Sequence, residues 1–342
     1  MMNNKFFRNI GICVIIVVSS LLLLGIASIY LNQPVNRSND TELFTIKRGT
    51  SMHEISATLK SRLLIRSELY ANMYARIFNL SLKAGTFKLS PSMTTSQILL
   101  YIDDGKQEYT KVTVPEGLTL SQTAKHLEET GVVNADEFSK AAHNPTILAK
   151  YHISGKDAEG YLFPDTYFFP YNEKAETVVS MMIQNFFTKV NSLEKIPENP
   201  AELNNKIILA SIIEREYRVV EEAPYIASVF SNRLKIGMGL QSCATIEYII
   251  TEIQQKPHPS KLSLEDLTIK NDYNTYMWAG LPPGPISNPG LVAISAAFSP
   301  ADTKYLYFRL TDPDAGTHSF TYSLDEHIEA GRHLVLKKAA GN

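Results

Sequence analysis

The longest uninterrupted apolar stretch of the chain lies near its N-terminus. Residues 9–33, NIGICVIIVVSSLLLLGIASIYLNQ, contain no charged side chain. A helix of about 20 apolar residues spans a bilayer core, so this stretch predicts a transmembrane helix over residues 10–31. A cleaved signal peptide is the alternative, but its apolar region is usually only about 7–15 residues long. We therefore expect an uncleaved anchor, with Lys5 and Arg8 on its cytoplasmic side in residues 1–9.

After a polar linker expected at residues 32–41, one layout of strand, glycine turn and amphipathic helix occurs twice. Four positions of the second copy carry a residue of the same character as the position 68 residues earlier. The pairs are Phe44 and Val112, Ile46 and Val114, Gly49 and Gly117, and Leu59 and Leu127. The layout is similar to the LysM-like modules that bind N-acetylated glycans, and it is equally a common strand–turn–helix unit. We expect a LysM-like α/β region over residues 42–155.

The second half of the chain predicts a mixed α/β domain over residues 156–342, so the whole fold is expected to be α+β. Residues 176–232 have mainly helical spacing of their apolar side chains. A long loop rich in proline and glycine follows at residues 273–290, and loops of this length are usually functional or disordered. A helix of small residues is expected at 291–300, and two strands around the turn DPDAG are expected at 305–323.

Composition narrows the range of functions. The chain has 342 residues, of which 44% are hydrophobic and 20% charged, as in an ordered protein of two or three domains. Its formal net charge of −2 gives no general attraction for nucleic acid. Because Cys13 lies in the apolar stretch, we expect no disulfide between it and Cys243. The eight histidines show no metal-ligand spacing, so neither a metal nor another cofactor is expected.

Two glutamates follow an apolar helical stretch in ILASIIEREYRVVEE, residues 208–222. If the helix continues through Val220, a turn of about 100° per residue places Glu216 in the middle of the apolar face. The same geometry places Glu214 about 160° away, on the polar face. We therefore interpret Glu214 as a solvated charge.

Glu216 has two interpretations. A carboxylate on an apolar face is costly unless it is paired or neutral. Burial raises the pKa of such a group, and a raised pKa suits a general acid at neutral pH. The alternative is a buried ion pair, for which Arg233 on the following helix is the candidate partner.

A set of motifs, which occur in a fixed order, resembles the YceG-like family of endolytic murein transglycosylases. The motifs are EGYLFPDTY, LASIIEREY, ASVFSNRLKIGMGLQS, YNTYMWAGLPPGPISNPG and THSF. The similarity extends from the N-terminal apolar stretch almost to the C-terminus. It implies a single-pass membrane protein with a LysM-like portion and a catalytic domain that faces the peptidoglycan.

The resemblance also implies a reaction and a catalytic residue. Glu216 is the second glutamate of the family's IIExE motif. It would protonate the oxygen of the β-1,4 bond between N-acetylmuramic acid and N-acetylglucosamine in nascent glycan strands. It would then act as base on the muramyl C6 hydroxyl, which closes a 1,6-anhydro ring and terminates elongation. Ordinary glycosidases usually need two carboxyl groups, and the helix shows no second one beside Glu216.

By the same resemblance, the candidate substrate-binding residues are Gln241, Thr245, Tyr273, Asn274 and Tyr276. For each of them, a structural role in packing the loop is an equal alternative. The chain departs from the family where an Asp-Pro pair usually follows the LQS or LQT segment. Here the sequence is LQSCAT, with Cys243 and Ala244 in those positions.

The resemblance implies peptidoglycan glycan strands as substrate and peptidoglycan synthases as candidate partners. The expected location is the bacterial inner (plasma) membrane, with a cytoplasmic N-terminus and a periplasmic catalytic domain. Two other functions stay open. One is a noncatalytic, membrane-anchored scaffold that binds peptidoglycan, in which Cys243 marks the loss of activity. The other is a hydrolase, which would leave reducing-end muramic acid.

Overall fold

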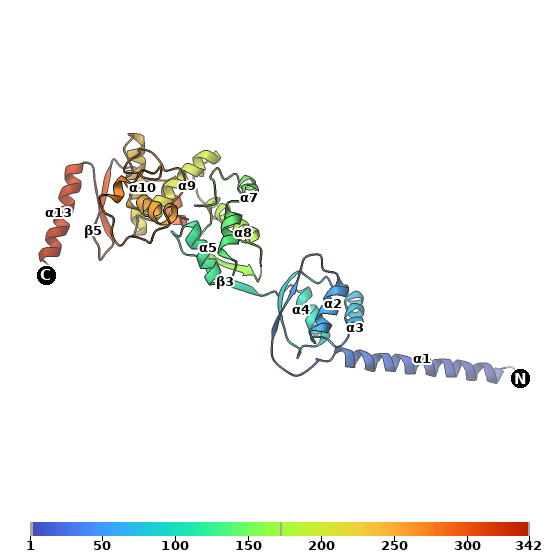
Figure 1. Cartoon of the computed structure of the whole chain (residues 1–342). Helices are drawn as coiled ribbons and strands as arrows, with labels where there is room; N and C mark the ends of the chain where they lie inside the picture. Colours follow the sequence, from blue (N-terminus) through green and yellow to red (C-terminus); the bar gives the residue numbers. More distant parts are fainter. Residues whose placement is uncertain (1–2, 172, 341–342) are drawn as a thin grey trace. The chain divides into compact units, whose positions relative to one another are not determined.

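The computed structural model of this chain describes residues 3–171 and 173–340 and has the α+β fold that the sequence predicted (Figure 1). Internal contacts divide the chain into two compact units. The first comprises residues 1–109 and 170–172, and the second comprises residues 110–169 and 173–342. The first two residues of the expected cytoplasmic N-terminus, and the last two of the chain, lie outside the described residues.

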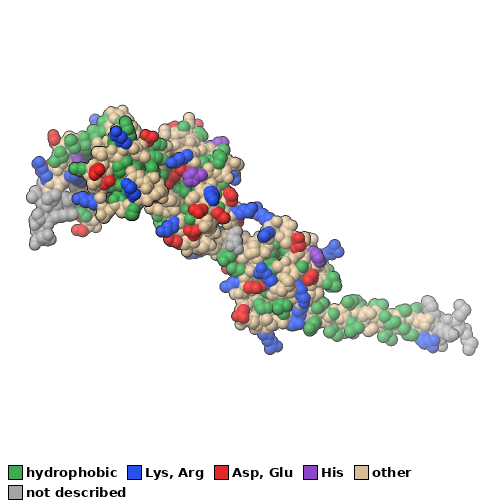
Figure 2. Space-filling view, viewed as in Figure 1, with side chains coloured by type: hydrophobic (Ala, Val, Ile, Leu, Met, Phe, Trp, Pro, Cys, Tyr) green, Lys and Arg blue, Asp and Glu red, His purple; other side chains and the backbone are tan. Residues whose placement is uncertain are grey.

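The first unit begins with one long helix, α1 (Asn3–Asn32). Its segment Arg8–Asn32 has a mean hydropathy of 2.9. Within the described part of the chain, it is the one helix that is long and apolar enough to cross a membrane. Its surface is largely hydrophobic and uncharged (Figure 2). The predicted span, residues 10–31, lies entirely within this helix.

The rest of the first unit is a small α+β fold. Its elements are β1 (Glu42–Ile46), α2 (Met52–Ser61), α3 (Glu68–Ile77), β2 (Gly85–Leu89) and α4 (Thr95–Asp103). The two strands pair antiparallel, and Phe44 faces Phe87 in the register. Both phenylalanines are buried with Leu59, Ile98 and Leu99 in a core of their own. This separate core makes the unit compact by itself.

The segment expected as a linker, residues 32–41, is held against the first unit by hydrogen bonds. The backbone N–H of Asn36 donates to the carbonyl of Pro91 over 3.3 Å. The Nη2 of Arg66 donates to the carbonyl of Pro34 over 2.6 Å. The segment has irregular backbone but is not a free tether.

The second unit is mainly helical. Its first elements are β3 (Tyr109–Thr113), α5 (Leu120–Glu129), α6 (Ala135–Ala142), α7 (Pro145–Lys150), β4 (Thr166–Pro170), α8 (Ala175–Val190) and α9 (Pro200–Glu214). They are followed by η1 (Val220–Glu222), α10 (Ala223–Lys235), α11 (Cys243–Tyr248), η2 (Ile249–Ile253), η3 (Asp266–Thr268) and α12 (Leu291–Phe298). The chain ends with β5 (Tyr307–Asp312), β6 (Thr317–Thr321) and α13 (Leu324–Ala340). Strands β3 and β4 form one two-stranded sheet, and β5 and β6 form another.

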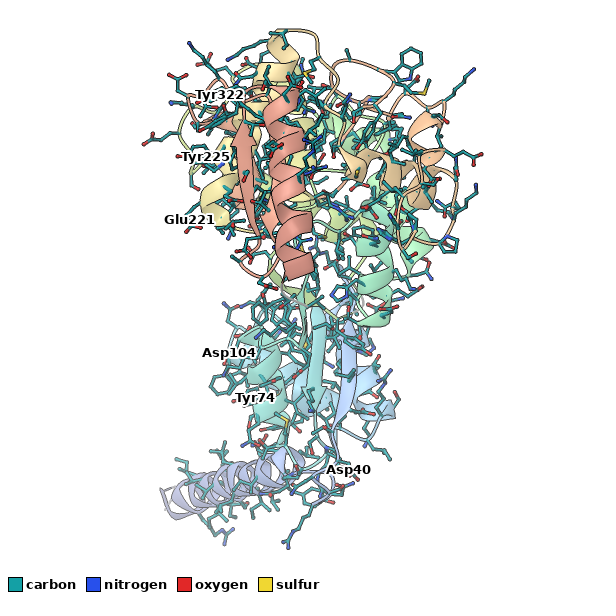
Figure 3. The ribbon with its side chains drawn as sticks, turned by 90° about the vertical axis from the view of Figure 1, so that its left-hand side faces the viewer. Asp40, Tyr74, Asp104, Glu221, Tyr225 and Tyr322 are labelled. Atoms are coloured by element: carbon teal, nitrogen blue, oxygen red, sulfur yellow. The ribbon has the colours of Figure 1, made fainter. Side chains whose placement is uncertain are left out.

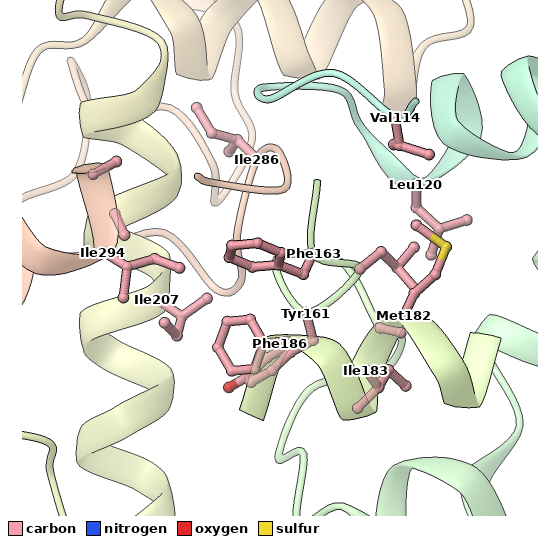
Figure 4. Close-up of a cluster of buried hydrophobic side chains, with 14 of the residues drawn as sticks. Val114, Leu120, Tyr161, Phe163, Met182, Ile183, Phe186, Ile207, Ile286 and Ile294 are labelled. Atoms are coloured by element: carbon pink, nitrogen blue, oxygen red, sulfur yellow. The ribbon is translucent and has the colours of Figure 1, made fainter. Parts of the chain in front are cut away.

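The core of the second unit surrounds α9. All side chains from Ile207 to Ile213 are buried, so this helix runs through the core. Figure 4 shows Ile207 beside Ile294 of α12 and near Tyr161, Phe163 and Phe186. Helix α12 packs on α9, and the short side chains of Ala293, Ala296 and Ala297, all buried, allow a close approach. This rigid core carries the end of α9, where the two glutamates lie.

Several predicted elements are confirmed in this unit. Residues 273–290 are a loop without a helix or strand, and the small-residue helix after it is α12. The hairpin forms from β5 and β6, which pair antiparallel around the predicted turn. Helix α13 lies against this hairpin (Figure 3).

The predicted strand–turn–helix layout is also confirmed at both positions. A glycine with positive φ makes the turn in each copy. Each helix then begins with a capping box, formed by Ser51 with Glu54 in α2 and by Thr119 with Gln122 in α5. These reciprocal bonds satisfy N–H groups that the first turn of a helix leaves without partners.

The two copies nevertheless belong to different units, so the domain boundary differs from the expected one at residue 155. Residues 110–155, expected to group with the segment from residue 42, pack into the second unit. The physical reason is the shared core, because Leu127 and Phe138 are buried in the same cluster as Phe163. A repeated layout is a local property, whereas the burial of apolar side chains decides which segments form one unit.

Candidate active site

The helix that carries the two glutamates ends earlier than expected. Helix α9 stops at Glu214, and Arg215 is its C-cap. The N–H groups of Arg215 and Glu216 donate to the carbonyls three residues back, which tightens the last turn. Val219 then has extended backbone, with φ −112° and ψ 125°. The prediction of a helix through Val220 is therefore wrong, and helical periodicity does not describe the surroundings of Glu216.

Glu216 is nevertheless held in a setting that changes its chemistry. The hydroxyl of Ser242 donates to its Oε1 over 2.5 Å. Burial raises the pKa of Glu216 to about 7, although the Ser242 hydrogen bond works in the opposite direction. At neutral pH this carboxyl group is therefore poised between its protonated and ionised forms.

Charged neighbours have opposite effects on the pKa of Glu216. The charge of Glu247 raises its pKa, and the charges of Arg215 and Arg233 lower it. Glu247 forms an ion pair with Arg215 over 3.1 Å and lies 3.5 Å from His258. A second carboxylate is thus near Glu216, on α11 rather than on its own helix.

The alternative ion pair between Glu216 and Arg233 does not form among the residues that the structure describes. The guanidinium of Arg233 donates instead to backbone carbonyls, from Nε to Leu306 over 2.6 Å and from Nη1 to Leu240 over 2.6 Å. Because Arg233 belongs to α10, these bonds attach both the start of β5 and the segment before Ser242 to that helix. Arg233 therefore assembles the walls around Glu216 and adds a positive charge to them.

Glu216 opens into a cavity of roughly 330 Å³. The lining residues are Glu216, Phe230, Arg233, Leu240, Gln241, Ser242, Cys243, Tyr276, Tyr307, Phe308, Arg309, Leu324 and His327. They come from α10, the LQSCAT segment, the long loop, the hairpin and α13. A volume of this size is within the range of small-ligand sites, and the mixture of aromatic and polar groups suits a sugar.

The hairpin wall of this cavity is fixed by a second buried contact. Glu222, just beyond Glu216 in the chain, accepts the backbone N–H of His318 over 3.0 Å. Its other oxygen lies 2.7 Å from Nδ1 of the same histidine. Because His318 is in β6, this double contact ties the hairpin to the segment that follows Glu216. The THSF motif therefore has a positioning role in the structure.

Glu214 is not the solvated charge that the sequence predicted. Its Oε2 accepts the backbone N–H of Gly290 over 2.9 Å at the start of α12. Burial, together with the charge of Glu116, raises its pKa to about 7. The physical reason for the error is tertiary, because the loop ending at Gly290 folds over the side of α9 that would otherwise face water.

The structure separates the five candidate substrate-binding residues into two groups. Gln241 and Tyr276 line the cavity of Glu216. Gln241 has a φ of +53°, which is rare for a residue with a side chain and is found more often at functional sites. The other three do not line this cavity.

Those other three have different surroundings. Thr245 is fully buried, and its hydroxyl donates to the carbonyl of Ser242 over 2.8 Å. Asn274 is also fully buried, and its amide donates to the carbonyls of Leu267 and Ile269. Tyr273 lines a different cavity, of roughly 490 Å³, with Asp157 and other residues. Thr245 and Asn274 therefore hold the loops in place.

Cys243, where the family usually has Asp, is exposed at the edge of the cavity. Its Sγ lies 3.1 Å from the hydroxyl of Tyr276. Partial burial of the thiol raises its pKa, so it is a neutral group at neutral pH. A thiol therefore stands where the family's pattern would place a carboxylate.

Sequence reasoning missed Ser242, Arg309 and His327 as members of the site. Ser242 stood within the quoted LQSCAT segment, and its position beside Gln241 was the signal that could have found it. No sequence signal connected Arg309 or His327 with Glu216. The docking of the hairpin and α13 brings them to the cavity.

Comparison with known proteins gives the same family by three routes. A protein of Bacillus subtilis (strain 168) named endolytic murein transglycosylase is 30% identical over 341 residues, which covers 93% of this chain and 92% of that protein. A protein of the same name from Streptococcus pneumoniae serotype 2 (strain D39) is 28% identical and covers 82% of this chain. This chain spans 56% of the pneumococcal protein.

A solved structure agrees with these relatives. The crystal structure of a yceG-like protein from Listeria monocytogenes matches with a TM-score of 0.57 and 31% sequence identity, covering 85% of this chain and 99% of that one. The model of the YceG-like family matches residues 44–333, which include Glu216 and every residue that lines its cavity. From the first strand to the last helix, the chain therefore belongs to the YceG-like family.

Proposed function

We propose that this chain is an endolytic murein transglycosylase in which Glu216 is the catalytic acid and base. It would cleave the β-1,4 bond between N-acetylmuramic acid and N-acetylglucosamine within glycan strands and leave 1,6-anhydro ends. The observation that carries the proposal is the state of Glu216, whose pKa is raised to about 7 at the wall of a sugar-sized cavity. The names of the Bacillus and Streptococcus relatives support the same activity.

The proposed reaction needs one carboxyl group in two successive roles. Protonated Glu216 donates its proton to the glycosidic oxygen as the bond from that oxygen to muramyl C1 breaks. The muramyl C6 hydroxyl then attacks C1, and ionised Glu216 accepts the hydroxyl proton. Because Ser242 already donates to Oε1, Oε2 is the oxygen free to carry the proton. The carboxyl group ends in the form in which it began.

The surroundings of Glu216 suit both roles. Burial keeps a large fraction protonated at neutral pH, which supplies the acid. The charges of Arg215 and Arg233, with the Ser242 hydroxyl, stabilise the carboxylate that exists after proton transfer. A pKa near the working pH makes each proton transfer accessible without a second catalytic carboxyl group.

The test is the product that the full-length chain, purified in detergent, releases from glycan strands. Wild type should give 1,6-anhydromuramic ends by mass spectrometry. Glu216→Gln should reduce the rate at least about 100-fold, because the amide cannot exchange the proton. Glu221→Gln is the matched control, since this nearby glutamate is exposed and should keep full activity. Full activity in Glu216→Gln would remove Glu216 from the mechanism.

Cys243 keeps two other outcomes open in the same experiment. If the neutral thiol, in place of the family's Asp, lets water compete with the C6 hydroxyl, the products will carry reducing-end muramic acid and the protein is a hydrolase. If the chain binds strands but releases no product, it is a membrane-anchored scaffold. Cys243→Asp tests the cause directly, because it restores the family's residue at the edge of the cavity.

The remaining parts of the proposal concern place and partners. We propose that α1 anchors the chain in the cytoplasmic membrane by a single pass, with the N-terminus inside and the catalytic unit outside. The compact fold of residues 42–109 would serve as a LysM-like glycan-binding module. Cleavage of nascent strands beside peptidoglycan synthases would make the protein a terminase of glycan elongation.

A further inference from the structure

The cavity of Glu216 has more positive charge than its own acidic groups balance. Arg233 is only 6% exposed, and its described hydrogen bonds all go to backbone carbonyls. No carboxylate among the described residues forms an ion pair with it. Backbone carbonyls and the ring of Tyr307, 5.2 Å away, hold the guanidinium in place, but they are uncharged groups and leave this cavity wall positive, which favours an anionic partner in the cavity.

Arg309 adds a second positive charge on the same cavity. It lies on β5, is exposed, and forms no ion pair within the described part of the chain. Its guanidinium lies against the backbone of α13 at Gly331, where a Cβ atom would come within 1.6 Å of Nη1. A side chain at position 331 would push this end of Arg309 aside, so the glycine allows the guanidinium to lie against the helix at the edge of the cavity.

The pKa of His327 is affected by both of these charges. This histidine lines the cavity from α13, and burial together with the charges of Arg309 and Arg233 lowers its pKa. The imidazole is therefore neutral at neutral pH and does not add to the positive charge. It does show that both guanidiniums act on the same space.

The charge balance depends on the state of Glu216. When Glu216 is ionised, it offsets part of the positive charge. When it is protonated, as the first step of the proposed reaction requires, two guanidiniums face a cavity whose own carboxyl group is neutral. A substrate that reaches this form of the site gains most if it brings a negative charge next to Arg309.

We propose that Arg309 binds a carboxylate of the substrate in this cavity, with the charge of Arg233 behind it, and so selects glycan units that carry a free carboxyl group. This inference rests on the proposed function of the same site. Guanidinium and carboxylate match as planar groups with two parallel hydrogen bonds, which makes Arg309 a specificity-determining residue.

A carboxylate at this place has two sources in peptidoglycan. One is the lactyl group of a muramic acid without a stem peptide, and the other is a free carboxyl group of the stem peptide. Strands stripped of peptides carry the first, and peptide-bearing strands carry only the second. Conversion of either carboxyl group to its methylamide removes the charge and adds only one methyl group.

The experiment measures binding of these strands to the full-length chain in detergent, with the Glu216→Gln substitution so that no strand is cut. Stripped strands and peptide-bearing strands are each compared with their methylamide forms. The acid form of one of the two should bind about tenfold more tightly than its amide. Adding Arg309→Gln should abolish that difference. Arg332→Gln, which removes an exposed arginine of α13 next to Gly331, should leave it unchanged.

Each outcome decides the proposal. A preference for the acid in stripped strands identifies the lactyl carboxylate, and a preference in peptide-bearing strands identifies the peptide. Equal binding of acid and amide forms in both strand types overturns the inference. The inference is also overturned if Arg309→Gln lowers the affinity for acid and amide forms by the same factor. Because binding is measured without cleavage, the result stands even if wild type proves to be a scaffold. Failure of the proposed function appears separately, as absence of product from wild type.

A variant that moves Arg309 without removing it provides a second test. Gly331→Ala keeps the charge but occupies the space of Nη1. It should weaken the preference for the acid form, whereas Ala330→Gly, at the neighbouring position of the same helix, should not. In the active enzyme, Arg309→Gln should raise KM for the preferred strand with little change in kcat. A fall in kcat with unchanged KM would contradict a binding role.

The pH dependence gives an independent readout. Binding of N-acetylmuramic acid or its peptide-bearing form, neither of which has a glycosidic bond to cut, should weaken in wild type as pH rises through about 7, because ionised Glu216 repels a carboxylate. The charged and titratable groups that face Glu216 or the cavity are Arg215, Arg233, Cys243, Glu247, Tyr276, Tyr307, Arg309 and His327. Glu216→Gln should remove this weakening and keep only the pH dependence that the other groups cause. An equal pH dependence in both proteins would contradict the charge balance described above.

Discussion

At the scale of single residues, the hydroxyl of Ser242 is the direct polar contact of Glu216 that the structure shows. This side chain is 2% exposed and donates to Oε1 of Glu216 over 2.5 Å. The bond stabilises the ionised carboxylate and fixes the direction of the other oxygen. Loss of the hydroxyl should therefore change both the pKa and the orientation of Glu216.

Ser242→Ala should move the high-pH limb of the kcat profile upward by roughly one pH unit and lower the maximal rate. The pKa of Glu216 rises because its ionised form loses a donor, so the general acid stays protonated to higher pH. Rates on glycan strands between pH 5 and 9 measure the effect. Ser228→Ala is a matched control, since Ser228 is also 2% exposed and bonds to Thr303 instead. An unshifted limb in Ser242→Ala would show that this bond does not control the acid.

Stability should also depend on Glu216 through pH. In the unfolded chain this group has an ordinary pKa of 4.5, and in the folded protein burial raises it to about 7. Its contribution is therefore fully present below pH 4.5 and is lost as pH rises through 7, because the folded state then ionises a carboxyl group that it holds less favourably than water does. Glu214, which has a similarly raised pKa, acts in the same direction.

At pH 8, Glu216→Gln should therefore have a free energy of unfolding on the order of 2 kcal/mol greater than that of wild type, and should unfold at a higher temperature. At pH 4.5 the two proteins should differ little. Calorimetry of the full chain in detergent at the two pH values measures this. The exposed Glu221→Gln should show no such pH-dependent difference. A mutant that is destabilised equally at both pH values would indicate a purely structural role for Glu216.

At the scale of elements, buried Asn288 orders the last part of the long loop before α12. Asn288 is 1% exposed. Its Oδ1 accepts the N–H groups of Gly160 and Leu162, and its Nδ2 donates to Leu118 and to Glu159. The side chain thus joins three segments that are distant in sequence. Glu159, itself buried, also accepts the N–H of Leu120 at the start of α5.

Asn288→Ala should lower the free energy of unfolding by roughly 3 kcal/mol, because it leaves buried donors and acceptors without partners. Urea unfolding of the full chain, followed by circular dichroism, gives the change. Asn191→Ala serves as the control, since Asn191 is exposed at the end of α8 and should cost little. A loss as small as that of the control would mean that water replaces these hydrogen bonds.

At the scale of the whole molecule, the proposed orientation places the N-terminus and the unit that carries Glu216 on opposite sides of the membrane that α1 spans. The chain has two cysteines, one in α1 and one at the edge of the Glu216 cavity, and both are free. Cys13→Ser leaves Cys243 as the single thiol. Because Cys243 is exposed, its reactivity reports on which side of the membrane the cavity faces.

In intact cells, or in spheroplasts where an outer membrane is present, a membrane-impermeant maleimide should label Cys243 in the Cys13→Ser chain. Labelling at pH 8.5 compensates for the raised pKa of the thiol. The Cys13→Ser, Cys243→Ser double variant gives the background. Labelling of Cys243 only after the cells are lysed would place the catalytic unit in the cytoplasm and contradict the proposed orientation.

The sequence by itself determined the features that depend on neighbouring residues. The apolar run of α1, the capping boxes that begin α2 and α5, and the β5–β6 hairpin all follow from short-range patterns. The motifs also identified Glu216 as the residue of interest. These features were predictable because their determinants, namely hydrophobic spacing, cap residues and turn residues, act over a few positions.

Only the tertiary structure decided what surrounds Glu216. Helical periodicity does not explain the setting of Glu216, because α9 ends at Glu214 and the contact comes from Ser242, far along the chain. Tertiary contacts also decide the surroundings of Glu214, which accepts the N–H of Gly290, and of Arg309, which lines the cavity because the hairpin packs beside it. A pKa depends on every charge and every buried atom nearby in space, so the acid and its proposed anion site exist only once distant segments share one core.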